Sequence, residues 1–213
     1  MQSKIEAKLE SADLGRLVGE IARCRICRDS PEGKALPHEP RPVMQVSETA
    51  RLLIAGQAPG TRVHQSGRPF TDPSGDRLRA WLGVTPDEFY DASRIAIVPM
   101  GFCFPGLTDK GADLPPRREC APAWRRRVMA ALPRIELVLA VGLYAQAWHM
   151  PGLVRSTLTG TVAAWREGAN LSPPVIPLPH PSWRNNAWLR ANPWFETEVL
   201  PDLRARVAAL IGR

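Results

Sequence analysis

The chain has 213 residues, 44% of them hydrophobic and 23% charged, which suits one globular domain over residues 1–213 with a substantial core. Its formal net charge of +7 is carried mainly by arginine, which favours a nucleic acid or phosphate partner, although genomic base composition explains arginine richness equally well. The chain has no run of about 18 apolar residues and no signal-peptide pattern, which excludes a membrane-spanning helix and predicts a cytoplasmic protein.

The predicted elements alternate between helices and strands along the chain. Four apolar runs predict strands, at residues 51–56, 94–100, 136–142 and 175–178. Helical patterns lie around and between them, at residues 5–23, 76–82, 120–132, 143–150 and 193–211, and Thr85 and Pro86 mark a further helix start. A proline-rich segment at residues 29–48 is expected to cover the sheet edge. The alternation predicts an α/β fold, a three-layer α/β/α sandwich with a central four-stranded parallel sheet.

The longest glycine- and proline-rich stretch follows the first strand, from Ile54 to Asp76. Open α/β sheets place ligands at the carboxyl ends of their strands, and this stretch is too long for a simple connector. It carries an aromatic ring, Phe70, and a carboxylate, Asp72. We therefore expect an irregular, ligand-binding loop that leads into a helix.

Four cysteines form two pairs with different spacings. Cys24 and Cys27 form a CxxC motif, whereas Cys103 and Cys120 lie far apart around a predicted loop. In a cytosolic protein such cysteines indicate metal ligands rather than disulfides, and both zinc and an iron–sulfur cluster accept four thiolates. The wide second spacing favours a cluster. One CxxC motif with two unrelated buried cysteines is the alternative.

Four motifs occur together on this α/β pattern. Residues 56–60 read GQAPG, residues 67–75 read GRPFTDPSG, the cysteine quartet is present, and His180-Pro181-Ser182 follows the last strand. Together they resemble the uracil-DNA glycosylase superfamily, in particular its iron–sulfur-containing bacterial and archaeal branches, families four and five. The resemblance covers most of the chain. It implies a monomeric, monofunctional enzyme of base-excision repair that hydrolyses the N-glycosidic bond of uracil in DNA and leaves an abasic site.

The resemblance also implies roles for individual residues. His180 would donate a hydrogen bond to O2 of the departing base, and Phe70 would stack on that base unless it only packs the loop. Gln57 and Ala58 would contact the base and position water, and Ser182 belongs to the same substrate-binding set. The cysteines would hold a 4Fe–4S cluster, or zinc as the alternative.

The region after His180 is the one that enters the minor groove in the superfamily. By that resemblance Arg184 and Arg190 would contact DNA phosphates, and Trp183, Trp188 or Leu189 would fill the space left by the flipped base. Packing against the final helix is the preferred interpretation for Trp188.

Two positions depart from the superfamily pattern. Its best-known members orient the attacking water with an Asp or Asn where this chain has Ala58, as families four and five do. Asp72 is the nearest substitute and would position water or stabilise the sugar cation, although capping a turn before Pro73 explains it nearly as well. Many members read uracil with an Asn where this chain has Pro99, so recognition must use backbone groups or another side chain.

These departures keep other functions open. A non-catalytic or slow sensor that binds uracil-containing or abasic DNA is the main alternative. A small-molecule α/β enzyme with a zinc staple follows if the resemblance is accidental. Covalent trapping of DNA, which one branch performs through a histidine before the fourth cysteine, is disfavoured because residues 114–119 contain no histidine.

Overall fold

The computed structural model describes residues 13–212, and within them four parallel strands form one sheet. The strands are β1 (Leu52–Ala55), β2 (Ile95–Ile97), β3 (Leu137–Val141) and β4 (Val175–Leu178), in the order β2-β1-β3-β4. All four predicted strands are present; β4 has its predicted bounds, and the other three are shortened by a few residues at their ends. The predicted α/β fold with a four-stranded parallel sheet is confirmed.

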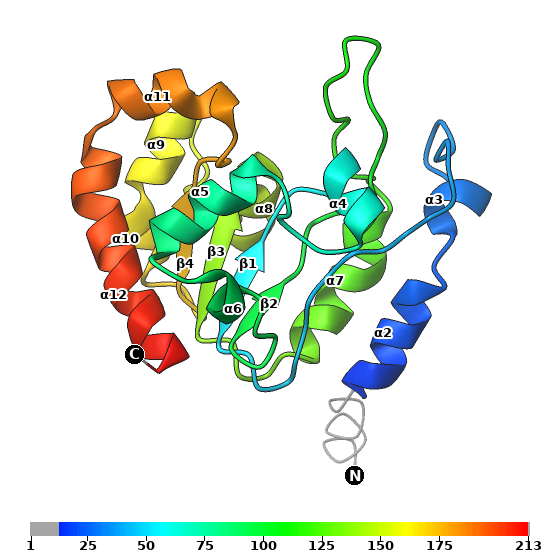
Figure 1. The fold of residues 1–213 in the computed structure, drawn as a ribbon, viewed down its shortest axis with the longest axis horizontal. Coiled ribbons are helices and arrows are strands. Elements are labelled where there is room, and N and C mark those ends of the chain that lie inside the picture. The colour runs from blue at the N-terminus through cyan, green and yellow to red at the C-terminus, as the bar shows by residue number, and fades with distance from the viewer. Residues whose placement is uncertain (1–12, 213) are drawn as a thin grey trace.

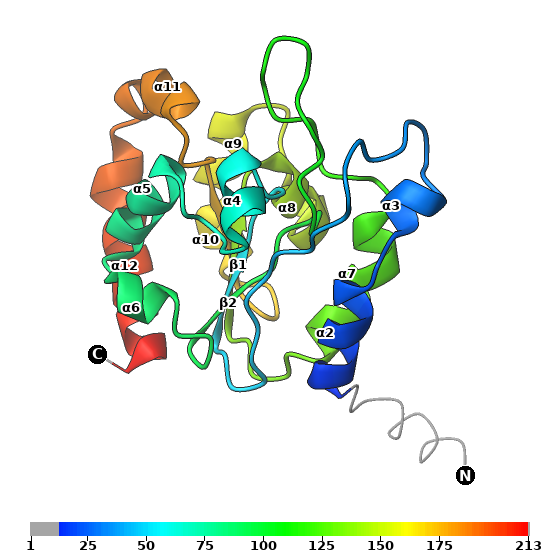
Figure 2. The ribbon, with the colours of Figure 1, turned by 45° about the vertical axis from the view of Figure 1, so that its right-hand side comes forward.

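Helices cover both faces of this sheet (Figures 1 and 2). The first half of the chain supplies α2 (Leu14–Ala22), α3 (Ile26–Asp29), α4 (Thr61–Ser66), α5 (Pro73–Leu82) and α6 (Pro86–Phe89). The second half supplies α7 (Cys120–Ala130), α8 (Leu143–His149), α9 (Leu158–Ala163), α10 (Trp165–Gly168), α11 (Asn186–Ala191) and α12 (Leu200–Ile211). Short 3-10 turns lie at Pro151–Leu153 and Trp183–Asn185, and a π-helical turn at Phe195–Val199. None of the described helices is long and apolar enough to cross a bilayer.

The strands are apolar on both faces because each face packs against a helical layer. Along β1, Leu52 and Ile54 point into the core shared with α5, α6 and α12, whereas Leu53 and Ala55 point into the core shared with α2, α7 and α8. The period of two that a strand imposes on its side chains divides such a run between two cores. This is why the strands could be predicted from continuous apolar runs.

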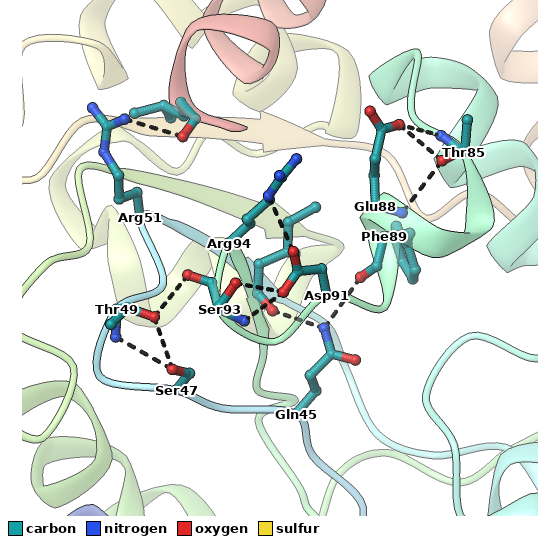
Figure 3. Close-up of polar contacts among 12 residues, drawn as sticks. Gln45, Ser47, Thr49, Arg51, Thr85, Glu88, Phe89, Asp91, Ser93 and Arg94 are labelled. Atoms are coloured by element: carbon teal, nitrogen blue, oxygen red, sulfur yellow. Dashed lines mark hydrogen bonds and ion pairs between the residues drawn. The ribbon is translucent and has the colours of Figure 1, made fainter. Parts of the chain in front are cut away.

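Residues 43–47 cover the outer edge of β2. Gln45 pairs with Ile97 in an antiparallel bridge, and its side-chain amide donates hydrogen bonds to the carbonyls of Phe89 (3.1 Å) and Ile95 (2.7 Å) (Figure 3). Figure 3 also shows Thr49 donating to the carbonyl of Ser93 (2.9 Å). These bonds satisfy backbone groups that an open edge would leave exposed. The predicted edge cover is confirmed.

Two predictions need correction, and part of a third cannot be compared with the structure. The stretch after β1 is not irregular throughout, because residues 61–66 form α4 between Gly60 and Gly67, which has φ of +71°. Only Val63 of that helix is buried, so no apolar periodicity reveals it. The last helix begins with a π-helical turn before α12, where Pro201 removes a backbone donor. The part of the N-terminal helix predicted before residue 13 lies outside the described residues.

Candidate active site

A pocket of about 70 Å³ opens at the carboxyl ends of the strands. The predicted residues Gln57, Ala58, Phe70, Asp72 and His180 all line it. They come from separate parts of the chain, namely the loop after β1, the start of α5 and the end of β4. The topology therefore brings His180 to the GQAPG segment, which lies far from it in the sequence, as the carboxyl edge of a parallel sheet does.

The GQAPG segment continues the sheet for two residues beyond β1. The carbonyls of Gly56 and Gln57 accept hydrogen bonds from Met100 and Gly101, each at 3.0 Å. A Cβ on Gly56 would lie 3.5 Å from the ring of Phe70, so a glycine here lets the ring lie directly over the backbone. The floor of the pocket is therefore rigid backbone with an aromatic ring against it.

Phe70 holds a backbone conformation that is rare for a residue with a side chain. Its φ is +55°, and its carbonyl accepts hydrogen bonds from Tyr90 Oη (3.1 Å) and Arg79 Nη1 (3.3 Å). A Cβ on Gly75 would lie only 1.9 Å from that same carbonyl oxygen. Strained residues held by surrounding contacts concentrate at functional sites. The ring of Phe70 is positioned by these contacts and meets Phe89 edge to face, with centroids 6.0 Å apart.

His180 lies at the end of β4 beside Gln57. A Cβ on Gly142 would lie 3.8 Å from His180 Cβ and 3.9 Å from Gln57 Oε1, so this glycine, with φ of +83°, gives both side chains room. Asn185 Nδ2 donates to the His180 carbonyl at 2.7 Å and holds the turn. Burial lowers the pKa of His180, and the carboxylates of Asp72 and Asp113 oppose this shift only in part. His180 is therefore neutral at pH 7 and has one N–H to donate.

Asp72 caps α5, as the alternative interpretation expected. Its Oδ1 accepts a hydrogen bond from the Gly75 backbone N–H at 3.1 Å, and Pro73 follows at the start of the helix. The side chain also borders the pocket. Its catalytic role stays a prediction.

Asp113 lies in the predicted loop between Cys103 and Cys120, and the sequence alone assigns it no role. The loop rises between β2 and α7 (Figure 1), and Leu107 pairs with Asp113 in an antiparallel bridge near its base. The Asp113 carboxylate lines the pocket and lies 3.5 Å from the position of a Cβ on Gly60. Nothing in the local sequence marks it, because only the folded loop brings it to the GQAPG segment.

Pro99 also borders the pocket but offers a ligand few polar groups. It has no N–H, and its carbonyl lies 3.3 Å from Nη1 of Arg125, which also binds the Val98 carbonyl at 2.6 Å. Arg125 is fully buried and additionally contacts His149. The backbone at this point is thus engaged from the far side of the sheet, and polar contacts to a ligand must come from other groups in the pocket.

The pocket opens into a wider groove of about 700 Å³. Ser182, Trp183 and Arg184 line one part of it, together with Arg62 and Arg77. Ser182 lies in this groove rather than in the inner pocket, and its carbonyl accepts a hydrogen bond from Arg77 Nη1 at 3.1 Å. The groove therefore combines three guanidinium groups with an indole ring.

The structure distinguishes the aromatic residues that follow His180. Trp183 is 72% exposed, whereas Trp188 packs against the core and donates its indole N–H to Thr159 Oγ1 at 2.9 Å. Leu189 also packs against that core. Arg190 is exposed on α11 and is not among the described residues that line the pocket or groove.

The four cysteines lie around one apolar cavity of about 20 Å³, away from the pocket. Cys120 Sγ accepts a hydrogen bond from the Phe102 N–H and Cys24 Sγ accepts one from Trp124 Nε1, both at 3.3 Å. Burial raises the pKa of Cys120 to about 12, so its thiolate needs a positive partner. No three His, Cys, Asp or Glu side chains within residues 13–212 are arranged to hold a single metal ion.

Comparison with protein families extends this description. Residues 43–204 match the family model of the Uracil DNA glycosylase superfamily. The matched region is well over half of the chain and contains every residue of the pocket, while Cys24 and Cys27 precede it.

Proposed function

The chain belongs to the uracil DNA glycosylase superfamily, and from this we propose that it is a monofunctional DNA glycosylase that hydrolyses the N-glycosidic bond of uracil in DNA. The observation that supports this most is the meeting of Phe70 and His180 in one pocket at the end of an arginine-lined groove. A glycosylase must take a base out of the stack and hold it in such a pocket. Superfamily membership supports DNA glycosylase activity in general, and uracil is our specific proposal.

The chemistry follows from the properties of the side chains in the pocket. Phe70 supplies a flat apolar surface for the flipped base. Neutral His180 donates its N–H to the O2 of the base as negative charge develops there, which stabilises the transition state more than the ground state. Gln57 lies beside His180 and contacts the base through its amide and backbone, together with Ala58.

The groove suits the DNA strands on either side of the flipped nucleotide. Arg62, Arg77 and Arg184 lie where phosphates would pass, and guanidinium groups bind phosphate through paired N–H bonds. Exposed Trp183 is the side chain that would enter the duplex in place of the base. No lysine is among the described residues that line the pocket, so a Schiff base has no amine and the product is an intact abasic site. The proposal includes action as a monomer on DNA with uracil or other deaminated bases, in the cytoplasm.

We assign the four cysteines to a 4Fe–4S cluster, with zinc as the alternative. Their common cavity and the N–H donors to two of the sulfurs support this, because such donors are typical around thiolate-bound iron. When bound, the cluster would cross-link α3, the loop after β2 and α7 without taking part in the reaction. Iron and sulfide analysis with visible absorbance distinguishes a cluster from zinc.

A DNA sensor without turnover is the second candidate, favoured by Ala58 and Pro99, which supply no side-chain amide or carboxylate to the pocket. A uracil-containing oligonucleotide, incubated with the protein and then heated in alkali, separates the two functions. Strand breakage indicates excision, whereas a stable complex without breakage indicates the sensor. His180→Ala should abolish excision while DNA affinity is retained. If the protein neither breaks the strand nor forms a stable complex, both candidates are contradicted.

A further inference from the structure

The pocket contains two carboxylates, and only one of them has both oxygens free of hydrogen bonds within residues 13–212. Asp72 already uses Oδ1 as the cap of α5. The Asp113 carboxylate accepts no hydrogen bond and forms no ion pair with any residue in the part of the chain that the structure describes. It is exposed at the junction of the pocket and the groove, and it borders both.

Asp113 approaches the segment that lacks its own carboxylate. Its Oδ2 lies 3.5 Å, and its Oδ1 3.9 Å, from the position of a Cβ on Gly60, two residues after Ala58. The carboxylate also acts on His180, because its charge raises the pKa of that histidine against the effect of burial. Asp113 and His180 therefore line the same pocket. The sugar of a flipped nucleotide would enter this pocket from the groove.

The hairpin that carries Asp113 has an ordered base. Leu114 N–H donates to the Gly106 carbonyl at 2.9 Å, and Thr108 N–H donates to the Ala112 carbonyl at 2.7 Å. These bonds enclose the bridge between Leu107 and Asp113. The base of the hairpin also packs on the loop that follows β2, where a Cβ on Gly101 would lie 3.2 Å from Pro116. Asp113 is thus held in place although it is in a long surface loop.

We propose that Asp113 is the carboxylate that activates the attacking water, a role that rests on the proposed glycosylase function. The bond between C1′ and the base nitrogen breaks, and its electron pair leaves with the base, whose O2 accepts a hydrogen bond from His180. The water oxygen then bonds to C1′ and passes one proton to Asp113. That proton then passes to the anion of the departed base, directly or through solvent, so the products are an abasic sugar and a neutral base. The negative charge of Asp113 also stabilises the cationic sugar.

The test compares Asp113→Asn with Asp109→Asn, which removes the same charge from an exposed position of the same hairpin outside the pocket and groove. Release of uracil from an oligonucleotide is measured in single turnover. Asp113→Asn should slow release about 100- to 10,000-fold, the usual range for loss of a general base. Asp109→Asn should release uracil at the wild-type rate, and both variants should bind uracil-containing DNA as tightly as wild type.

Azide distinguishes water activation from other roles, because it attacks C1′ without losing a proton. Azide should restore base release by Asp113→Ala and leave the wild-type rate unchanged. If the wild-type protein is active and Asp113→Asn releases uracil at the same rate, the role of Asp113 is overturned and the proposed function is not. Slow release that azide does not restore, together with weaker binding, would make Asp113 a binding residue and also overturn it. An inactive wild-type protein would overturn the proposed function and this role together.

Discussion

Gly75→Ala tests whether the strained position of Phe70 is needed for excision. The added Cβ would lie 1.9 Å from the Phe70 carbonyl oxygen, 2.7 Å from its carbonyl carbon and 2.9 Å from its Cβ. Backbone atoms cannot rotate away as the end of a side chain can. The segment that carries Phe70 must therefore move, and the hydrogen bonds from Tyr90 and Arg79 to its carbonyl must lengthen or break. Overpacking of this kind costs about 1–3 kcal/mol of stability.

The expected result is a loss of excision that exceeds the loss of folded protein. Stability is measured by urea unfolding, and excision in single turnover at a temperature where the variant is fully folded. Gly168→Ala is a matched control, since its Cβ would lie 2.2 Å from the Val175 carbonyl at the start of β4, away from the pocket. It should destabilise the protein to a similar degree and leave the excision rate of the folded protein unchanged. Equal excision rates for the two variants would refute the reasoning.

Three further predictions concern pH, DNA binding and the helix cap. Burial lowers the pKa of His149 to about 3, so the folded protein loses stability as pH falls below about 6.5. At pH 5 this loss is about 2 kcal/mol, and it should be absent from His149→Gln in urea unfolding. An unchanged pH dependence in the variant would contradict this. Trp183→Ala should weaken binding to uracil-containing duplexes in a gel-shift titration without lowering the melting temperature of the protein. Trp188→Ala should lower the melting temperature of the protein. The reverse pattern would exchange the roles of the two residues. Asp72→Ala should cost about 1 kcal/mol in urea unfolding, and Asp72→Asn, which keeps a capping oxygen, much less. Normal excision by Asp72→Asn is expected if the residue serves only as the cap.

The strands could be predicted from the sequence because both faces of the sheet are covered. A strand buried on both sides is a continuous apolar run, and β4 was predicted with its observed bounds at residues 175–178. Helix α4 has one buried side chain, Val63, and its limits are set by glycines that are also common in loops. Periodicity therefore fails for short helices that pack through few residues.

The sequence by itself determined the motifs, their order and the superfamily that they indicate. It also placed the glycine-rich segment at the carboxyl edge of the parallel sheet, because that segment follows a predicted strand. The resemblance to that superfamily implied the roles of Phe70 and His180. Only the tertiary structure decided that Asp72 caps a helix through one oxygen and that Asp113 reaches the GQAPG segment. It also decided that Trp183 is exposed while Trp188 is packed. Each of these features depends on contacts between parts of the folded chain that local sequence spacing does not specify, and such contacts cannot be predicted from the type of side chain alone.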